Sequence, residues 1–221
     1  MKRMMLAMLS VVAQGVAAQV PPTAGEAAAY AGLHAAAWLG DAAAVAGAGK
    51  AALAARDAQG RTPLHVATFA RRHAAIRALA AAGADLGALE NDRYDAVTIA
   101  AVADDEATLA LLLELGASAK LVTSRYDGTA LIAAAHLGHE GVVRQLIRAG
   151  APLDHVNNLH WTALIEAVVL GDGGARHQAV LRDLLAAGAN PRLTDRQGRT
   201  ALELARGRGY AAMVQQLQAA R

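Results

Sequence analysis

The strongest constraint on the fold is an eleven-residue stretch that the chain contains twice. It reads DAQGRTPLHVA over residues 57–67 and DRQGRTALELA over residues 195–205. When the threonine of each copy is set at one position, the chain aligns on itself at Thr62, Asp95, Thr129, Thr162 and Thr200. The steps between these positions are 33, 34, 33 and 38 residues. A period of this length indicates internal repeats, each of them one supersecondary unit.

A second marker, the dipeptide Gly-Ala, keeps the same register. It occurs at residues 83–84, 116–117, 150–151 and 188–189. Two markers that drift together make coincidence a poor explanation. The chain has 221 residues, of which 55% are hydrophobic, so we expect one repeat array with enough apolar surface for a core.

The residue types around the marker positions predict a helix with defined ends. A threonine side-chain oxygen can accept from unpaired backbone N–H groups, and Pro63 suits the first helical position. The first helix of each unit therefore begins after Thr62 and its equivalents. A second helix follows, as in Val142, Val143, Leu146 and Ile147, whose apolar spacing is helical. We expect it to end at the Gly-Ala glycine, which easily takes a left-handed conformation.

Two further positions of the first helix indicate how the units pack. One inward position holds Leu64, Val97, Leu131, Leu164 and Leu202. Three residues later stand Ala67, Ala100, Ala134, Ala167 and Ala205, small side chains that let neighbouring helices approach. No single unit can bury its apolar face alone, so the turn and the cap recur because each repeat rebuilds them.

The 33-residue period with TPLHVA at residues 62–67 resembles the ankyrin repeat family. The resemblance covers about Ala31 to the C-terminus and is strongest over residues 127–151. It implies an all-α repeat solenoid of ankyrin repeats, each unit a β-turn plus two antiparallel helices, with about six units including caps. It also implies that His34 and His65 form hydrogen bonds within the turns. We divide the chain into three parts: residues 1–18 as a signal peptide, residues 19–30 as a lead segment, and residues 31–221 as the repeat array.

The pattern weakens in three places. In the first unit, Gly47 and Gly49 stand where a second helix should be strong. At the C-terminus Met213 and Leu217 can face inward while glutamines face water, as in a terminal cap. The fifth unit carries an insertion around residues 171–178, GDGGARHQ, which we expect to lengthen the turn between its helices as a flexible loop.

The first eighteen residues have the three parts of a secretory signal peptide. Lys2 and Arg3 precede an apolar run, and the small residues at 16–18 precede Gln19. The apolar run is too short to span a membrane, so we expect cleavage after Ala18 and a periplasmic or secreted protein with no membrane insertion.

Composition narrows the partner classes further. Removal of Lys2 and Arg3 takes the formal charge of +2 to zero before the termini are counted, so a basic field for nucleic acid is absent. With no cysteine, the chain has no disulfide framework. We expect a monomer stabilised by packing.

The motifs that imitate catalytic or metal sites fail on their spacing. The stretch HLGHE, residues 136–140, lacks the four-residue histidine spacing of a zinc protease. GAGKAA, residues 47–52, lacks the first glycine and the Ser or Thr of a phosphate loop. We therefore expect no cofactor, no metal, no catalytic residue and no enzymatic activity. The alternative is a hydrolase in the fifth-unit insertion, with Asp172 and His177 converging on a pocket.

The scarce aromatic residues predict a binding surface. The residue before each marker position and the residue seven after it are expected to face outward on the concave side, as the family resemblance implies. Tyr, Trp and Arg dominate binding hot spots. The predicted partner-binding residues are Arg61, Phe69, Arg93, Tyr94, Arg125, Tyr126, His136, His160, Trp161 and Arg199. Packing between neighbouring turns is the alternative role of the aromatics, with Trp38 in the first unit open to either interpretation.

The function that these features favour is a periplasmic protein-interaction module. It would bind another exported or envelope protein, as an inhibitor, an immunity factor or a protective factor. The alternatives are a cell-wall component that stacks glycans on Tyr94, Tyr126 and Trp161, and the hydrolase named above.

Overall fold

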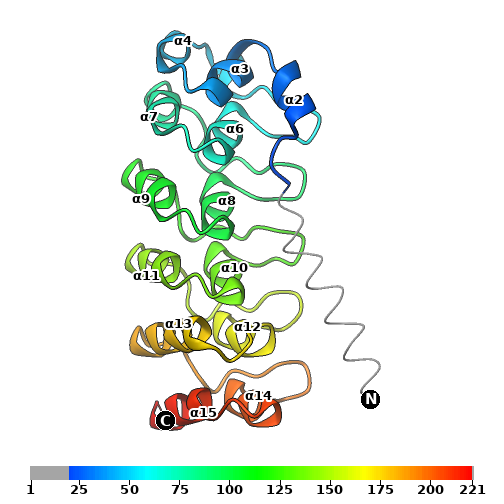
Figure 1. The fold of residues 1–221 in the computed structure, drawn as a ribbon, viewed down its shortest axis with the longest axis vertical. Helices are drawn as coiled ribbons and strands as arrows, with labels where there is room; N and C mark the ends of the chain where they lie inside the picture. The colour runs from blue at the N-terminus through cyan, green and yellow to red at the C-terminus, as the bar shows by residue number, and fades with distance from the viewer. Residues whose placement is uncertain (1–19, 221) are drawn as a thin grey trace. The chain divides into compact units, whose positions relative to one another are not determined.

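The computed structural model describes residues 20–220, so the expected signal peptide lies outside the described residues. The described chain forms two compact units, residues 20–118 and residues 119–220 (Figure 1). The sequence pattern predicts a continuous array and does not mark this division.

The N-terminal unit consists of a lead helix followed by three helix pairs. Its helices are α2 (Ala24–Ala29), α3 (Gly32–Leu39), α4 (Ala42–Ala46), α5 (Lys50–Leu53), α6 (Pro63–Phe69), α7 (His73–Ala81), α8 (Ala96–Val102) and α9 (Glu106–Glu114). The first helices α3, α6 and α8 contact one another in sequence, as do the second helices α4, α7 and α9. In the first pair the second helix is broken into the short α4 and α5, as Gly47 and Gly49 led us to expect.

The C-terminal unit repeats the same arrangement with three helix pairs. Its helices are α10 (Ala130–Leu137), α11 (Glu140–Arg148), α12 (Ala163–Val169), α13 (Ala175–Ala186), α14 (Ala201–Arg208) and α15 (Ala211–Ala219). The first helices α10, α12 and α14 form one row and the second helices α11, α13 and α15 the other (Figure 1). Over residues 20–220 there are thus six helix pairs, and the predicted repeat solenoid is confirmed.

The predicted helix ends are also confirmed. Each first helix after α3 begins directly behind its marker residue; Asp95, for example, accepts from the backbone N–H of Thr98 at 2.8 Å. Thr62 shares its cap with His65, whose Nε2 also lies 3.1 Å from the carbonyl oxygen of Tyr94. The Gly-Ala glycines take φ values of 77° to 94° just beyond the second helices, where a side chain would be strained.

The core follows the two predicted positions. In every first helix after α3, the inward Leu or Val is at most 3% exposed, and the alanine three residues later is at most 1% exposed. Small residues at the second position let successive first helices approach closely, and the larger residues fill the space between the rows. Stability therefore comes from the interfaces between consecutive helix pairs.

The fifth-unit insertion corrects one prediction. Instead of only lengthening the turn, it extends the second helix, so that α13 has 12 residues where α7, α9 and α11 have nine. The remaining residues are held in place: Asp172 accepts from the backbone N–H of Gly174 at 2.8 Å, and Tyr210 donates to the carbonyl oxygen of Gly171 at 3.0 Å. Helix propagation adds one hydrogen bond per residue, which favours extending α13 over a longer loop.

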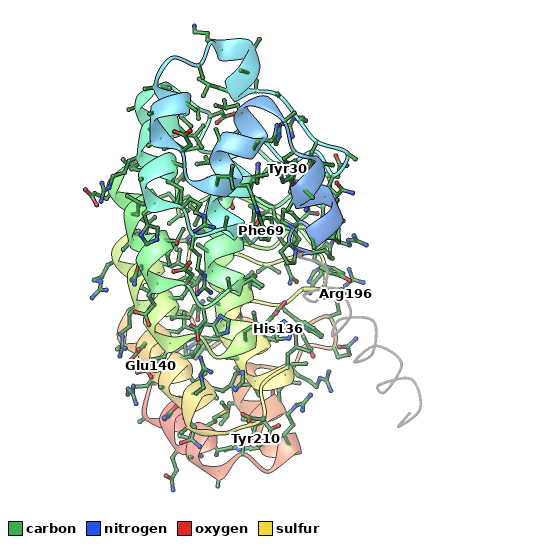
Figure 2. All side chains as sticks on the ribbon, turned by 45° about the horizontal axis from the view of Figure 1, so that its top comes forward. Tyr30, Phe69, His136, Glu140, Arg196 and Tyr210 are labelled. Carbon is green, nitrogen blue, oxygen red and sulfur yellow. The ribbon has the colours of Figure 1, made fainter. Side chains whose placement is uncertain are left out.

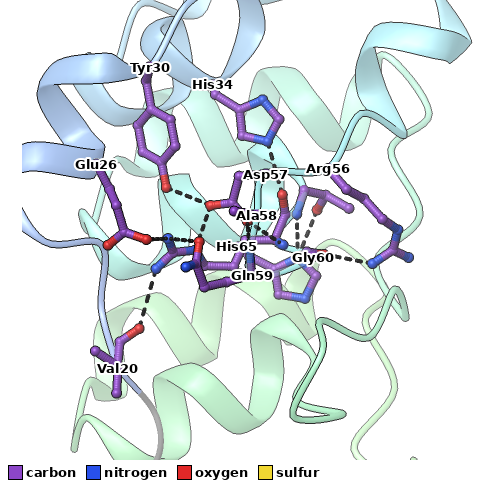
Figure 3. A network of polar contacts seen from close by, with 12 residues as sticks. Val20, Glu26, Tyr30, His34, Arg56, Asp57, Ala58, Gln59, Gly60 and His65 are labelled. Atoms are coloured by element: carbon purple, nitrogen blue, oxygen red, sulfur yellow. Dashed lines mark hydrogen bonds and ion pairs between the residues drawn. The ribbon is translucent and has the colours of Figure 1, made fainter.

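The lead segment covers the first turn of the array through Arg61. The Arg61 side chain is 2% exposed and donates to Asp57 at 2.6 Å and to Glu26 at 2.8 Å (Figure 3). Tyr30 donates to the same Asp57 carboxylate at 2.8 Å, and Arg61 also reaches the carbonyl oxygen of Val20. Burial alone would raise the pKa of Asp57, but the hydrogen bonds from Arg61 and Tyr30 lower it below its usual value. One guanidinium therefore joins the lead segment to the first repeat turn.

Replacing Arg61 by Met should destabilise the N-terminal unit by about 3 kcal/mol, because it leaves the carboxylates of Asp57 and Glu26 without their shared cation. This loss should become smaller at low pH. Because folding lowers the pKa of Asp57, its carboxylate stabilises the folded state above the pKa of the unfolded chain, and this stabilisation disappears as pH falls through the folded pKa. Urea unfolding followed by circular dichroism measures both effects.

The matched control is Arg199→Met. Arg199 forms the equivalent pair with Asp195 in the last turn at 2.7 Å, but its side chain is 44% exposed. Removal of this solvated partner should cost only about 1 kcal/mol. Equal losses in the two variants would show that burial under the lead segment adds nothing to the first pair.

Candidate interaction surface

Two of the predicted binding residues are buried. Arg61 is 2% and Tyr94 5% exposed, so the prediction that these side chains face outward is wrong. Both stand directly before the helix cap. Arg61 is enclosed by the lead segment, and the Tyr94 backbone is bonded to Glu90 in both directions, its N–H at 3.0 Å from the carboxylate. The burial of a turn residue depends on which segment packs against it, and the spacing of the sequence does not reveal that segment.

The turn tips of the C-terminal unit do present side chains to solvent. Tyr126 and Trp161 are half-buried, and His160, at φ 63°, is exposed. The two tips are joined through Asn158, whose backbone N–H donates to the Tyr126 carbonyl at 2.9 Å and whose side chain donates to the Arg125 carbonyl at 3.0 Å. The aromatic side chains therefore stand on a backbone that is already ordered.

Asn157 orders the tip that carries Trp161 from within. Its side-chain oxygen accepts from the backbone N–H groups of Leu159 and Trp161, both at 3.0 Å, and the residue is 3% exposed. The same role falls to Asp57 and Asp195 in the first and last turns, where an arginine four residues later pairs with the carboxylate. In the Asn157 turn Trp161 stands at the position of that arginine, so an aromatic ring takes the place of the ion pair found in the Asp57 and Asp195 turns.

The other predicted residues are distributed over both units. Arg93 and Arg125 are exposed at turn tips, Phe69 is half-buried at the end of α6, and Arg199 is partly exposed but paired with Asp195. His136 lies at the end of α10, and Arg196, on the loop before α14, donates to the carbonyl oxygen of Asn158 (Figure 2). Arg196 was absent from the predicted set and joins the neighbouring tips.

Trp38, for which the sequence left two roles open, lies beside the lead helix. With Tyr30 and Leu39 it lines a cleft of about 520 Å³ against α2. The Tyr30 ring stacks on His34 at a centroid distance of 5.5 Å and lies tilted to Trp38 at 6.4 Å. His34 itself lies 2.9 Å from the carbonyl oxygen of Arg61, the turn contact that the sequence led us to expect. Trp38 thus helps to seat the lead segment.

Sequence reasoning missed a buried acid, Glu166 on α12. It is 5% exposed, and burial raises its pKa to about 8. The Asn157 side chain donates to one carboxyl oxygen at 2.8 Å, and Nδ1 of His136 lies 3.5 Å from the other. The signal was present in the sequence, because the equivalent positions hold Val66, Ile99, Ala133 and Leu204. A glutamate at an aliphatic position is the kind of departure that marks a functional or strained site.

His136 is also kept neutral by its surroundings. Burial lowers the pKa of His136 to about 4, assisted by the charges of His177 and His139 when those are protonated. Its side chain is 11% exposed, and its buried Nδ1 has no hydrogen-bond partner, although the Glu166 carboxyl lies 3.5 Å away. Burial thus favours the neutral form of both His136 and Glu166.

The hydrolase alternative meets an obstacle in the geometry of its two residues. Asp172 and His177 do lie together, with Nδ1 of His177 at 3.0 Å from the carboxylate. Nε2 of His177, however, lies 2.8 Å from the carbonyl oxygen of His136, so both ring nitrogens face acceptors within the protein. A general base needs a free nitrogen aimed at its substrate. The contacts instead connect the insertion to α10.

Charge is divided unequally between the two units, which the net value conceals. Residues 20–118 hold 7 Lys or Arg against 11 Asp or Glu, whereas residues 119–220 hold 11 against 8. Several of these cations, Arg125, Arg192 and Arg196 among them, lie in the exposed loops that precede first helices. The C-terminal unit therefore presents a basic field together with its aromatic turn tips.

Two further kinds of feature are absent from residues 20–220. No group of three or more His, Cys, Asp or Glu side chains is placed to hold a metal ion there. In the same part of the chain, no helix is both long enough and apolar enough to cross a membrane.

Known proteins resemble this chain along most of its length. The family model for ankyrin repeats (3 copies) matches residues 97–195, and the single ankyrin repeat model matches residues 59–91. The Escherichia coli K12 ankyrin repeat protein YahD is 37% identical over 165 residues, which cover 74% of this chain and 82% of that protein.

Solved structures agree with the sequence comparisons. An ankyrin repeat domain from Acinetobacter baumannii AYE is 42% identical, with a TM-score of 0.79, over 85% of this chain and 96% of that one. The ankyrin repeat domain of Bcl-3, of the IkappaB family, is 28% identical with a TM-score of 0.75, over 87% and 86% of the two chains. Ankyrin repeats form protein-interaction modules and are a typical non-enzymatic scaffold. With its period, its caps and these relatives in agreement, the chain belongs to the ankyrin repeat family.

Proposed function

We propose that this protein is a periplasmic, non-enzymatic module that binds a folded exported or envelope protein through the turn tips of its C-terminal unit. The observation that carries the proposal is the ordered pair of tips bearing Tyr126 and Trp161. Their backbones are bonded to each other through Asn158, so little conformational entropy is lost when a partner docks on the rings. Trp161 is half-buried, which leaves part of the residue accessible to a partner.

Charge supports an acidic face on the partner. Two exposed arginines add positive charge at the aromatic tips, because Arg125 directly precedes Tyr126 and Arg196 donates to the carbonyl oxygen of Asn158. Complementary charge speeds encounter and fixes orientation, while the aromatic anchors supply most of the binding energy. Inhibition, immunity and protection all follow from occupying another protein's surface, which is the only action open to such a module.

The binding test is affinity capture from periplasmic extract with residues 19–221 as bait. The double variant Tyr126→Ala, Trp161→Ala should lose the captured partner by tenfold or more, because it removes both aromatic anchors. A rise in salt from low to physiological ionic strength should weaken capture by the unaltered protein.

The matched control is Arg148→Ala, Arg182→Ala, which changes exposed residues of the second helices α11 and α13. It should capture as much partner as the unaltered chain, and circular dichroism should show all variants folded. Equal capture by both double variants would place the binding surface elsewhere. Sedimentation with purified cell wall, lost only in the aromatic variant, would favour the glycan-binding alternative instead.

The proposed periplasmic location is tested separately from the binding surface. The protein recovered from the periplasm should begin at Gln19, as read from its intact mass. A chain that keeps Met1 and stays in the cytoplasmic fraction would contradict the proposed location without bearing on the binding surface.

A further inference from the structure

Among residues 20–220, no lysine or arginine lies close enough to balance the buried carboxyl of Glu166. One oxygen accepts from Asn157 at 2.8 Å, and the other lies 3.5 Å from Nδ1 of His136. An isolated buried carboxylate is costly, whereas the neutral acid is not.

The elements packed around α12 bring few other titratable groups towards this carboxyl. Helix α10 contributes His136, and helix α13 contributes His177, which binds Asp172 in the loop before that helix. Helix α14 contributes Arg208, whose guanidinium is bonded to the carbonyl oxygen of Val169. His139, the N-cap residue of α11, lowers the pKa of His136 through its charge. His136 is therefore the titratable side chain closest to Glu166 among those that the structure places around it.

The geometry constrains where the protons of the pair reside. Nδ1 of His136 is buried without a hydrogen-bond partner, and the Glu166 carboxyl lies 3.5 Å away, so Nδ1 is the acceptor nearest to a proton on that oxygen. A neutral imidazole has one N–H, and when Nδ1 accepts, that N–H is on Nε2. Nε2 is not among the buried unpartnered atoms of the described residues, and His136 lies in the last turn of α10, where it is only partly buried.

We propose that Glu166 is a positioning residue for His136: its carboxylic acid fixes the imidazole as the Nε2–H tautomer and makes the end of α10 a neutral hydrogen-bond donor. The partner group that fits this donor is an oxygen acceptor, a carbonyl or a carboxylate, on the bound protein. The role in binding rests on the proposed function, whereas the tautomer is a property of the free protein and is tested without a partner.

The first test is long-range ¹H–¹⁵N NMR of the ¹⁵N-labelled protein between pH 5 and 7. His136 should show a protonated Nε2 and an unprotonated Nδ1 throughout, with no titration across this range. Two protonated nitrogens would indicate an ion pair, and a protonated Nδ1 the opposite tautomer. Either result would overturn the proposal.

Two substitutions distinguish a role of Glu166 in fixing the His136 tautomer from a role in packing alone. Glu166→Gln keeps the geometry, because its amide oxygen can accept from Asn157 and its NH₂ can donate to Nδ1, so the Nε2–H tautomer should persist. Glu166→Leu restores the aliphatic residue found at Leu204 and should fold, but His136 should become a mixture of tautomers. The signals of exposed His160 serve as the internal control in both. An unchanged tautomer in Glu166→Leu would show that Glu166 does not determine it.

Stability against pH gives an independent prediction. Because folding raises the pKa of Glu166, its contribution to folding stability is fully present below the pKa of the unfolded chain. That contribution is lost as pH rises through about 8. The lowered pKa of His136 acts oppositely, its contribution being lost as pH falls through about 4. The unfolding midpoint of Glu166→Gln, measured relative to the unaltered protein, should therefore rise steadily from pH 5 to pH 8. A difference that does not vary with pH would contradict a neutral buried acid.

The donor itself is tested in the capture experiment by His136→Phe, which keeps a ring but removes the N–H. Capture should fall severalfold in His136→Phe and be retained in Glu166→Gln. Full capture by His136→Phe would overturn the donor role, and if the Tyr126 and Trp161 variant still loses capture, the proposed function stands without it.

Discussion

Each of the two units depends on the apolar interface between one helix pair and the next within that unit. The alanine at the close-approach position and the Leu or Val three residues before it are almost wholly buried in every repeat after the first. These contacts join neighbouring helix pairs, so stability accumulates from one pair to the next within each unit. A consequence is that the two ends need cover. The lead segment gives it at one end, where Glu26 and Tyr30 bind the Asp57 and Arg61 pair.

The turns add a polar framework to this apolar one. A carboxylate or amide five residues before the cap accepts backbone N–H groups of its own turn, as Asp57, Asn157 and Asp195 do. In the first and last turns the carboxylate also takes an arginine. In the Asn157 turn the amide donates instead to Glu166 on α12, and Trp161 stands at the position of the arginine. The turn with Asn157 in place of aspartate therefore differs from the other two in having an aromatic residue at its tip and a buried acid beneath it.

That exchange connects the two parts of the proposed surface. Asn157 binds the Trp161 turn on one side and the Glu166 carboxyl on the other, and the same carboxyl faces His136 at the end of α10. A turn tip and an inner-helix position are therefore ordered by one buried polar chain. Such chains are stable only when their members are satisfied, which is why the protonation of Glu166 matters to the whole face.

The sequence by itself determined the repeat period, the helix caps, the two core positions and the weak second helix of the first unit, because each depends on residues within a few positions of one another. Only the tertiary structure decided which side chains reach solvent. Arg61, Tyr94 and Trp161 occupy one repeat position, yet two are buried and one is half-exposed, since exposure depends on the segment that packs above. The meeting of His136 with Glu166 was hidden for the same reason. The two residues stand thirty positions apart, and only the stacking of α10 against α12 brings their side chains together.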